Sequence, residues 1–358
     1  MKLHIADAPG RAVSPLTAAH LQAGDGAHGV TRPTVIFRNP HSALRIRSAF
    51  SLVEVLVVIT LLSLIVLALM AVFNSAQTAF RASVTQTDVL GGGRATMDMM
   101  TADLRQMAPS LGYSNSLVQF RPTFFYCNSN NPVNFYAGTN KYGLQPLVQS
   151  LPGSAAQRTN VLENFFILSR GNLNGSPTWF GTGYVVWPGA TNSLYPLYRF
   201  YMTTNVEASP NPAALFNSFM SAIFNSAYTG GFTNSNWSHL VDGVVDLRVR
   251  AYDLNGVWMT NGYPSRYTNV AKNVFFLPST LGECGFYMFS NTLPASVEIE
   301  LGVLEDRTLQ RAGSLGIAGQ PPSPAVPIQW QYLQNQAGKV HIFRQRVTLP
   351  NVDPSSYQ

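Results

Sequence analysis

One apolar stretch, Val55–Phe73, constrains what this chain can fold into more than any other feature. Its only polar side chains are those of Thr60 and Ser63. At about 1.5 Å of rise per helical residue the stretch is roughly 28 Å long, close to the ~30 Å hydrocarbon thickness of a bilayer. It is longer than the apolar core of a cleavable secretory signal. We therefore expect a transmembrane helix over residues 52–73 that stays with the mature chain.

The charges before this stretch indicate which side of the membrane its N-terminal end faces. Residues 1–49 contain six Lys and Arg, among them Arg45 and Arg47, against the two acids Asp7 and Asp25. Six minus two leaves +4 for this segment, which is most of the +6 of the whole chain. Basic residues beside a membrane helix mark its cytoplasmic side, so this charge indicates topology and not a nucleic-acid surface.

Glu54 stands directly before the stretch, and no further charged residue occurs until Arg81. A carboxylate that must enter lipid without a partner costs a few kcal/mol, so an acid at this position is more often functional than accidental. The simpler interpretation is an interfacial acid that only marks where the membrane helix starts.

The residues around Glu54 resemble a known processing site. Ser48-Ala49-Phe50-Ser51-Leu52-Val53-Glu54 is similar to the cleavage site of type IV prepilins and of the pseudopilins of type II secretion. Those proteins have a basic leader, a small residue before the cut, Phe at the first mature position, Glu at the fifth, and then an apolar helix. The chain departs from the pattern at Ala49, where the family usually has Gly, which implies slower cleavage.

The resemblance implies roles for three residues. A prepilin peptidase would cut between Ala49 and Phe50, and the new α-amino group of Phe50 would be methylated. Glu54 would pair with the amine of a neighbouring subunit, which satisfies two charges that are costly in lipid and fixes the register of packed helices. The implied partners are the peptidase and methyltransferase, the membrane, and other pilin or pseudopilin subunits, without nucleic acid, metal or cofactor.

The helix is expected to continue beyond the membrane, over residues 50–108. Gly91–Gly93 should interrupt or bend it, since each Gly in a helix interior costs roughly 1 kcal/mol relative to Ala. After them, an apolar stripe recurs at helical spacing and predicts a face packed on a globular domain, before Pro109 and Gly112 end the helix. The stripe consists of Met97, Met100, Leu104 and Met107.

Residues 109–358 alternate short apolar runs with Gly, Pro and Asn turns, which predicts an antiparallel β-rich domain. Several runs alternate apolar with charged residues, which predicts strands with one buried and one wet face. Asp253-Leu254-Asn255-Gly256 predicts a turn, with calcium binding as the weaker alternative. Residues 129–240 match no pattern and are expected to include long loops or an insertion. The expected strands are Phe165–Ser169, Gly183–Trp187, Leu197–Thr203, Val244–Tyr252, Ala295–Leu304 and Lys339–Leu349.

Three further segments resemble the J-type minor pseudopilins. Arg94–Gln106 ends in an Asp-Leu-Arg-Gln run, as helices of that family do before the first strand. Leu247–Asp253 and Leu293–Ile299 are similar to two of its strands, in the same order. The resemblance implies a subunit near the tip of the filament, with a minor pilin of a type IV pilus as a close second.

The two cysteines, Cys127 and Cys284, both follow the membrane helix. In an oxidising compartment a disulfide between them is allowed, and for so long a loop it would be worth about 4 to 5 kcal/mol. Two separate buried thiols fit the sequence equally well. A metal site is disfavoured, because no Cys or His lies at ligand spacing near either cysteine.

Candidate catalytic groups are few. His239 and His341 are the only histidines after the leader, and they are far apart in sequence. Glu298 and Glu300 share a strand face, and a hydrolase could use such a pair of carboxylates, although acids on an exposed strand are more often solvated. We therefore expect a noncatalytic protein. The alternative is a membrane-anchored exported hydrolase or carbohydrate-binding domain with an uncleaved signal anchor.

These features together predict an α+β fold, in which a long N-terminal transmembrane helix of the pilin type is packed on a C-terminal antiparallel β-rich globular domain. The charged fraction of 11% is low for a soluble domain, where about 25% is typical, and fits an exported surface. The expected location is the bacterial inner membrane, with the leader 1–49 cytoplasmic and residues 109–358 periplasmic, and then a filament or pseudopilus. The sequence does not identify the secretion or pilus system or its cargo.

Overall fold

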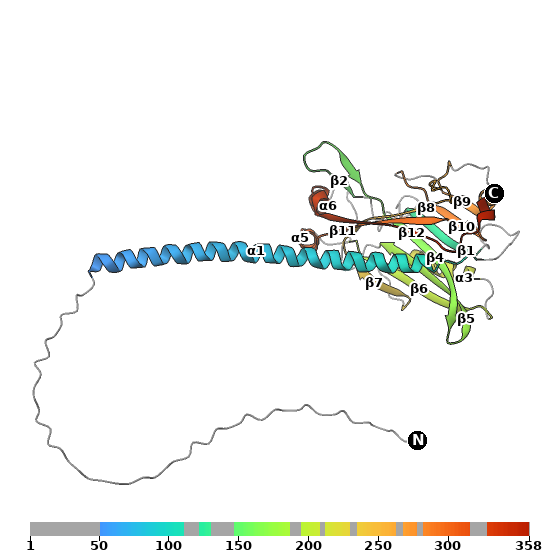
Figure 1. The fold of residues 1–358 in the computed structure, drawn as a ribbon, viewed down its shortest axis with the longest axis horizontal. Coiled ribbons are helices and arrows are strands. Elements are labelled where there is room, and N and C mark those ends of the chain that lie inside the picture. Colours follow the sequence, from blue (N-terminus) through green and yellow to red (C-terminus); the bar gives the residue numbers. More distant parts are fainter. Residues whose placement is uncertain are drawn as a thin grey trace, which may run out of the picture. The chain divides into compact units, whose positions relative to one another are not determined.

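The computed structural model describes residues 51–110, 122–129, 147–186, 195–207, 212–229, 235–262, 268–277, 282–315 and 328–357. They form one long helix, α1 (Leu52–Arg105), and an antiparallel β-rich region, so the fold is α+β (Figure 1). The chain divides into two compact units, Met1–Val66 and Leu67–Gln358, and all of the strands belong to the second. The predicted leader, with Ala49 and Phe50, lies outside the described residues.

The larger sheet has seven antiparallel strands in the order β7-β6-β5-β4-β1-β10-β9. Residues 129–240, where the sequence predicted long loops or an insertion, supply β4 to β7 and the helix α3 (Ala213–Thr229), so this segment is an integral part of the sheet. The strands are β1 (Thr123–Ser129), β4 (Glu163–Leu173), β5 (Ser176–Val186), β6 (Leu197–Asn205), β7 (Trp237–Val241), β9 (Val274–Phe276) and β10 (Phe286–Phe289).

The smaller sheet has three antiparallel strands in the order β12-β11-β8. Strand β8 (Val244–Tyr252) has the bounds that the sequence predicted, while β11 (Ser296–Leu304) and β12 (Val340–Thr348) are shorter than predicted by a residue at one or both ends. A two-stranded hairpin completes the β-structure. The remaining elements are β2 (Val148–Ser150), β3 (Gln157–Thr159), α4 (Thr268–Asn273), α5 (Asp306–Ser314), α6 (Ile328–Gln334), and the 3-10 turns η2 (Ala337–Lys339) and η3 (Pro354–Tyr357).

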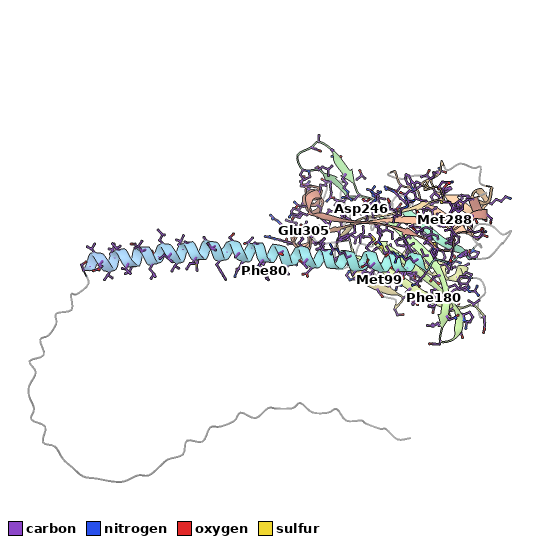
Figure 2. All side chains as sticks on the ribbon, viewed as in Figure 1. Phe80, Met99, Phe180, Asp246, Met288 and Glu305 are labelled. Carbon is purple, nitrogen blue, oxygen red and sulfur yellow. The ribbon has the colours of Figure 1, made fainter. Side chains whose placement is uncertain are left out.

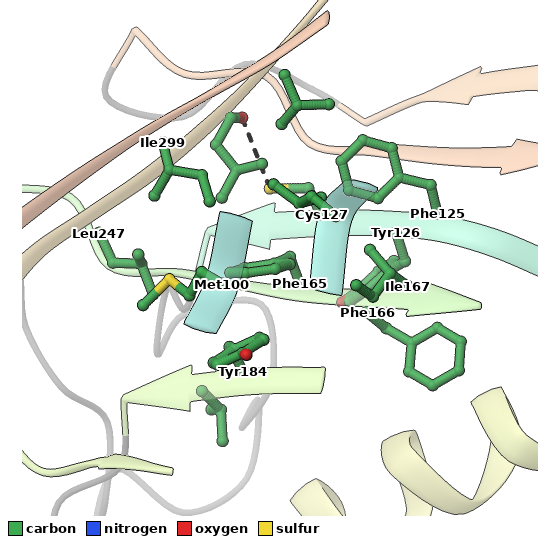
Figure 3. Close-up of a cluster of buried hydrophobic side chains, with 14 of the residues drawn as sticks. Met100, Phe125, Tyr126, Cys127, Phe165, Phe166, Ile167, Tyr184, Leu247 and Ile299 are labelled. Atoms are coloured by element: carbon green, nitrogen blue, oxygen red, sulfur yellow. Dashed lines mark hydrogen bonds between the residues drawn. The ribbon is translucent and has the colours of Figure 1, made fainter. Parts of the chain in front are cut away.

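The last turns of α1 lie between the two sheets. Figure 3 shows Met100 with Phe165 and Tyr184 of the larger sheet on one side and Leu247 and Ile299 of the smaller sheet on the other. All five side chains are fully buried, or nearly so. The core is therefore built around the helix, because each sheet places its apolar face against it.

The helix α3 covers the other face of the larger sheet. Successive residues of a strand point to opposite faces, so Phe165 of β4 faces α1 while Phe166 faces α3, where its ring centroid lies 5.4 Å from that of Phe219. A Cβ at Gly183 of β5 would lie 2.3 Å from Cε2 of Phe219. The position therefore needs glycine for α3 to pack this closely.

Candidate functional site

The helix α1 begins with a cap made by Ser51. The hydroxyl oxygen of Ser51 accepts a hydrogen bond from the backbone N–H of Glu54 at 3.2 Å, and its carbonyl accepts one from Val55 at 3.2 Å. Ser-x-x-Glu is the sequence of a capping box, and an acid in the first turn of a helix is favoured by the helix dipole. Glu54 therefore favours the start of the helix by itself, whatever its role toward other molecules.

The side chain of Glu54 is exposed, and no described residue forms an ion pair with it. The side chains that follow it are apolar for several turns. If the helix enters lipid, this carboxylate either stays in the water at the membrane surface or is neutralised by a cation from beyond the described part of the chain.

The first part of α1 has an apolar surface on all sides. The large apolar side chains from Leu52 to Phe73 are between 46% and 81% exposed. Within the described residues, α1 is the one helix long and apolar enough to cross a membrane. A helix that is apolar all round needs either a membrane or other helices around it.

The two polar side chains of the stretch Val55–Phe73 are satisfied by the helix itself. The hydroxyl of Thr60 donates to the carbonyl of Val57 at 2.8 Å, and that of Ser63 donates to the carbonyl of Thr60 at 2.8 Å. Hydroxyls bonded in this way need no water, so they are compatible with lipid on all sides.

The last part of α1 is held in the domain by the predicted stripe. Met97, Met100, Leu104 and Met107 are at most 4% exposed, which confirms the prediction of a packed face. The helix ends at Arg105, ahead of the expected stop at Pro109, because the chain then joins β4. Met107 forms a β-bridge with Ser169, and the N–H of Ala108 donates to the carbonyl of Leu168 at 2.9 Å.

An ion pair that the sequence did not predict fixes the rotation of this part of α1. Arg199 of β6 donates to both carboxylate oxygens of Asp103, at 2.9 and 3.1 Å. The hydroxyl of Tyr184 of β5 donates to the same carboxylate at 2.5 Å, and burial together with this carboxylate raises the pKa of Tyr184 well above its usual value. These residues are too far apart in sequence for any local pattern to join them.

The expectation that Gly91–Gly93 interrupts the helix was wrong, because α1 is continuous through all three. A Cβ at Gly93 would lie 2.3 Å from Cε2 of Phe343 on β12, and one at Gly92 would lie 3.8 Å from Val241 on β7. At Gly91 nothing lies within 4 Å. The close approach of the helix to β12 therefore requires glycine at one position of the three.

The outer face of the smaller sheet carries alternating charges, and we call it the Arg–Glu face. In register, Glu298 lies between Arg250 and Arg346, and Glu300 lies between Arg248 and Arg344. Cross-strand pairs of opposite charge stabilise a sheet, and this arrangement flanks each acid of β11 with two arginines.

The two candidate catalytic acids are part of this network. Arg344 donates to Glu298 at 2.7 Å, and Arg158 of β3 lies 3.6 Å from Glu300. Glu298 therefore accepts a charged hydrogen bond, and Glu300 lies within ion-pair distance of a guanidinium group, as in a structural network of cross-strand charges.

The predicted wet face of β8 is buried at Asp246, the first of its charged residues. The side chains of Asp246 and Glu283 are 0% and 2% exposed, and both accept hydrogen bonds from Arg248. Burial raises the pKa of Asp246, although Arg248 and the N–H of Val161 oppose the shift. The hairpin β2-β3 contributes to this cover, since Arg158 also donates to Asp246 at 3.0 Å.

Both cysteines are free buried thiols, which is the second of the two arrangements that the sequence allowed. Cys127 donates weakly to the carbonyl of Val249 on β8, and the N–H of Val249 donates to Glu163 at 2.5 Å. Burial raises the pKa of the Cys127 thiol, and Glu163 adds to the shift. Burial also raises the pKa of Glu163 to about 8, against an ordinary 4.5. Cys127 and Glu163 therefore bond to the backbone C=O and N–H of Val249 on β8, an outer strand of the smaller sheet.

The remaining candidate residues for binding or catalysis each contact one or two neighbouring groups. Asp253 forms the predicted turn, because its carboxylate accepts from the N–H of Asn255 at 2.9 Å and of Val257 at 2.7 Å. His239 lies 2.9 Å from Asp242, and His341 lies 3.5 Å from Glu305. In the described ranges, no three His, Cys, Asp or Glu side chains are arranged to hold a metal ion.

The candidate functional site is therefore α1 itself, with Glu54 at its start and the stripe and Asp103 at its end. Met97 to Met107 could be read from helical spacing, whereas Arg199 and Tyr184 could not. Comparisons with protein-family models, with curated proteins and with solved structures find no match to this chain.

Proposed function

We propose that this chain is a noncatalytic subunit of a pilin-like filament, either a minor pseudopilin of a type II secretion system or a minor pilin of a type IV pilus. One observation carries the proposal. A single helix, α1, joins an exposed apolar part, which directly follows Glu54, to a part whose stripe is buried in a β-rich domain. A filament subunit needs both parts, because the first packs against the helices of other subunits and the second fixes the domain to them.

The proposed path starts with the prepilin peptidase, which cuts between Ala49 and Phe50 and leaves a methylated amine on Phe50. The helix stays in the inner membrane, with the β-rich domain in the periplasm. Glu54 then pairs with the amine of a neighbouring subunit, and the apolar surfaces of adjacent helices form the filament core. This contact joins different surfaces of two subunits and so extends into an open assembly.

The experiment that tests the proposal separates the two roles of the helix start. Glu54→Ala removes the carboxylate, whereas Ser51→Ala removes the capping hydroxyl and leaves the acid. We expect Glu54→Ala to abolish incorporation into sheared filaments, measured by immunoblot, and Ser51→Ala to preserve most of it. Both variants should stay in the membrane after carbonate extraction.

Two results would contradict the proposal. Normal incorporation of Glu54→Ala would remove the role assigned to the acid. Equal losses in Glu54→Ala and Ser51→Ala would show that both residues serve only the local cap of the helix.

A further inference from the structure

A groove with a volume of about 450 Å³ lies between α1 and α5. Figure 1 shows α5 beside α1, and Figure 2 labels Phe80 on the helix close to this place. On α1 the lining includes Phe80, Arg81 and Val84, and on α5 it includes Asp306, Arg307 and Gln310. The whole groove lies within the unit Leu67–Gln358.

The chemistry of the lining is that of a site for a phosphate group with an apolar neighbour. The lining contains the guanidinium groups of Arg81 and Arg307 and the carboxylate of Asp306, which accepts a hydrogen bond from Gln310 at 2.7 Å. Phe80 is 71% exposed, so a large ring faces solvent beside the two arginines. Guanidinium groups bind phosphate oxygens well, because their donors match the geometry of the anion.

The position of the groove along α1 also places it close to the membrane surface. Arg81 follows Phe73, the last residue of the apolar stretch, by eight residues, which corresponds to about 12 Å of helix. Side chains on a helix lean toward its N-terminus, and a long Arg side chain can extend along the helix toward the membrane surface. The headgroup layer is about 5 to 8 Å thick on each side of the hydrocarbon. The guanidinium of Arg81 therefore falls in or next to this layer.

We propose that this groove binds the headgroup phosphate of an anionic phospholipid. Arg81 and Arg307 hold the phosphate from two sides, and the exposed ring of Phe80, which lies on the membrane side of Arg81, contacts the glycerol. The bound lipid ties α5 of the β-rich domain to the membrane surface. The inference rests on the membrane span of the proposed function, but not on cleavage or filament assembly.

The test uses the full chain in nanodiscs of phosphatidylcholine that contain a minority of phosphatidylglycerol. Native mass spectrometry counts the phosphatidylglycerol molecules that each protein carries out of the disc. Arg81→Gln and Arg307→Gln should each lower the retained fraction about fivefold, the usual effect of one basic residue at an anionic surface. Arg311→Gln is the matched control on α5, since Arg311 lies over the ring of Tyr332 at 5.6 Å and does not line the groove.

Unchanged retention in Arg81→Gln and Arg307→Gln would overturn the inference, and so would an equal loss in Arg311→Gln, which would indicate general surface charge. If the groove variants keep the lipid but fail to enter filaments, the groove is a contact for another subunit and the inference is wrong. Release of the wild-type chain from membranes by carbonate would instead refute the membrane span, and the proposed function would fail with it.

Discussion

The two ends of α1 share one secondary structure and have opposite surroundings. Between Leu52 and Phe73 the large apolar side chains are exposed on all sides of the helix, whereas between Met97 and Met107 the apolar stripe of Met97, Met100, Leu104 and Met107 is buried and charged residues occupy much of the rest. Helix formation does not depend on which of these patterns is present. The comparison shows that the distribution of apolar residues around the axis, and not the helix itself, determines what surrounds each part.

The polar side chains of the two parts of α1 also differ in their hydrogen-bond partners. Thr60 and Ser63 in the first part are bonded to carbonyls of their own helix, so they impose no orientation on it. Asp103 in the last part is bonded to Arg199 and Tyr184 from two strands. The domain therefore bonds to polar groups of the last part of α1, whereas the hydroxyls of Thr60 and Ser63 in the first part bond to their own helix.

The largest effect that tests this comparison is expected from Met100→Ala. Met100 is fully buried, so the free energy of unfolding of the β-rich domain should fall by about 2 to 5 kcal/mol in a denaturant titration in detergent. The neighbouring Met99 is 39% exposed, and Met99→Ala should change it by less than about 0.5 kcal/mol. Equal losses in both variants would mean that the stripe is not the packed face.

The second effect is expected from Asp103→Asn, which leaves Arg199 without its carboxylate. Removal of one partner of a buried ion pair costs about 3 to 5 kcal/mol. Because the two side chains are 15% and 21% exposed, we expect a smaller loss of about 2 kcal/mol. Asp98→Asn, on the exposed side of the helix, is the control and should have no measurable effect. A loss as large in Asp98→Asn would remove the special role of Asp103.

A buried glutamate of the β-rich domain makes its stability depend on pH. Burial raises the pKa of Glu163 on β4 to about 8. Between its ordinary 4.5 and about 8, the folded state keeps a proton that the unfolded state has lost, so the free energy of unfolding falls as pH rises. The slope is at most about 1.4 kcal/mol per pH unit.

The measurement is a set of unfolding titrations from pH 5 to pH 8 on the wild type and on Glu163→Gln. The variant cannot ionise, so its stability should depend less on pH over about this window. Parallel curves for the two proteins would show that Glu163 does not titrate there.

The smallest effect separates the glycines of the helix. Gly93→Ala should destabilise the domain by about 1 kcal/mol, because the ring of Phe343 has to move. Gly91→Ala meets nothing within 4 Å and should stabilise the helix by up to about 1 kcal/mol. Thermal unfolding of the two variants in parallel would show this opposite sign. Shifts of the same sign would mean that the contact with Phe343 carries no cost.

Local periodicity predicted the parts of the fold that depend on a single element. The stripe from Met97 and the strand β8 were predicted because burial of one face leaves a period of 3.6 or 2 in the sequence. Strand β1 was missed, since Phe124, Phe125 and Tyr126 are all fully buried and show no alternation. Helix α3 does carry a periodic signal in the sequence, because Leu215, Phe219 and Ile223 recur every four residues and are all buried.

The features that depend on distant residues could not be predicted. Asp103 and Arg199, or Arg81 and Arg307, come together only through the fold. The same is true of Gly93, whose contact with Phe343 turns an apparent helix breaker into a packing requirement. For the candidate site, the sequence predicted Glu54 and the stripe, but not the ion pair or the groove.

The most direct test of the central claim is the mass of the mature N-terminus of the protein isolated from its native membranes. The account predicts a chain that begins at Phe50 with a methylated α-amino group and retains the apolar part of α1. A chain that still begins upstream of Phe50, or one cut after Phe73, would contradict it.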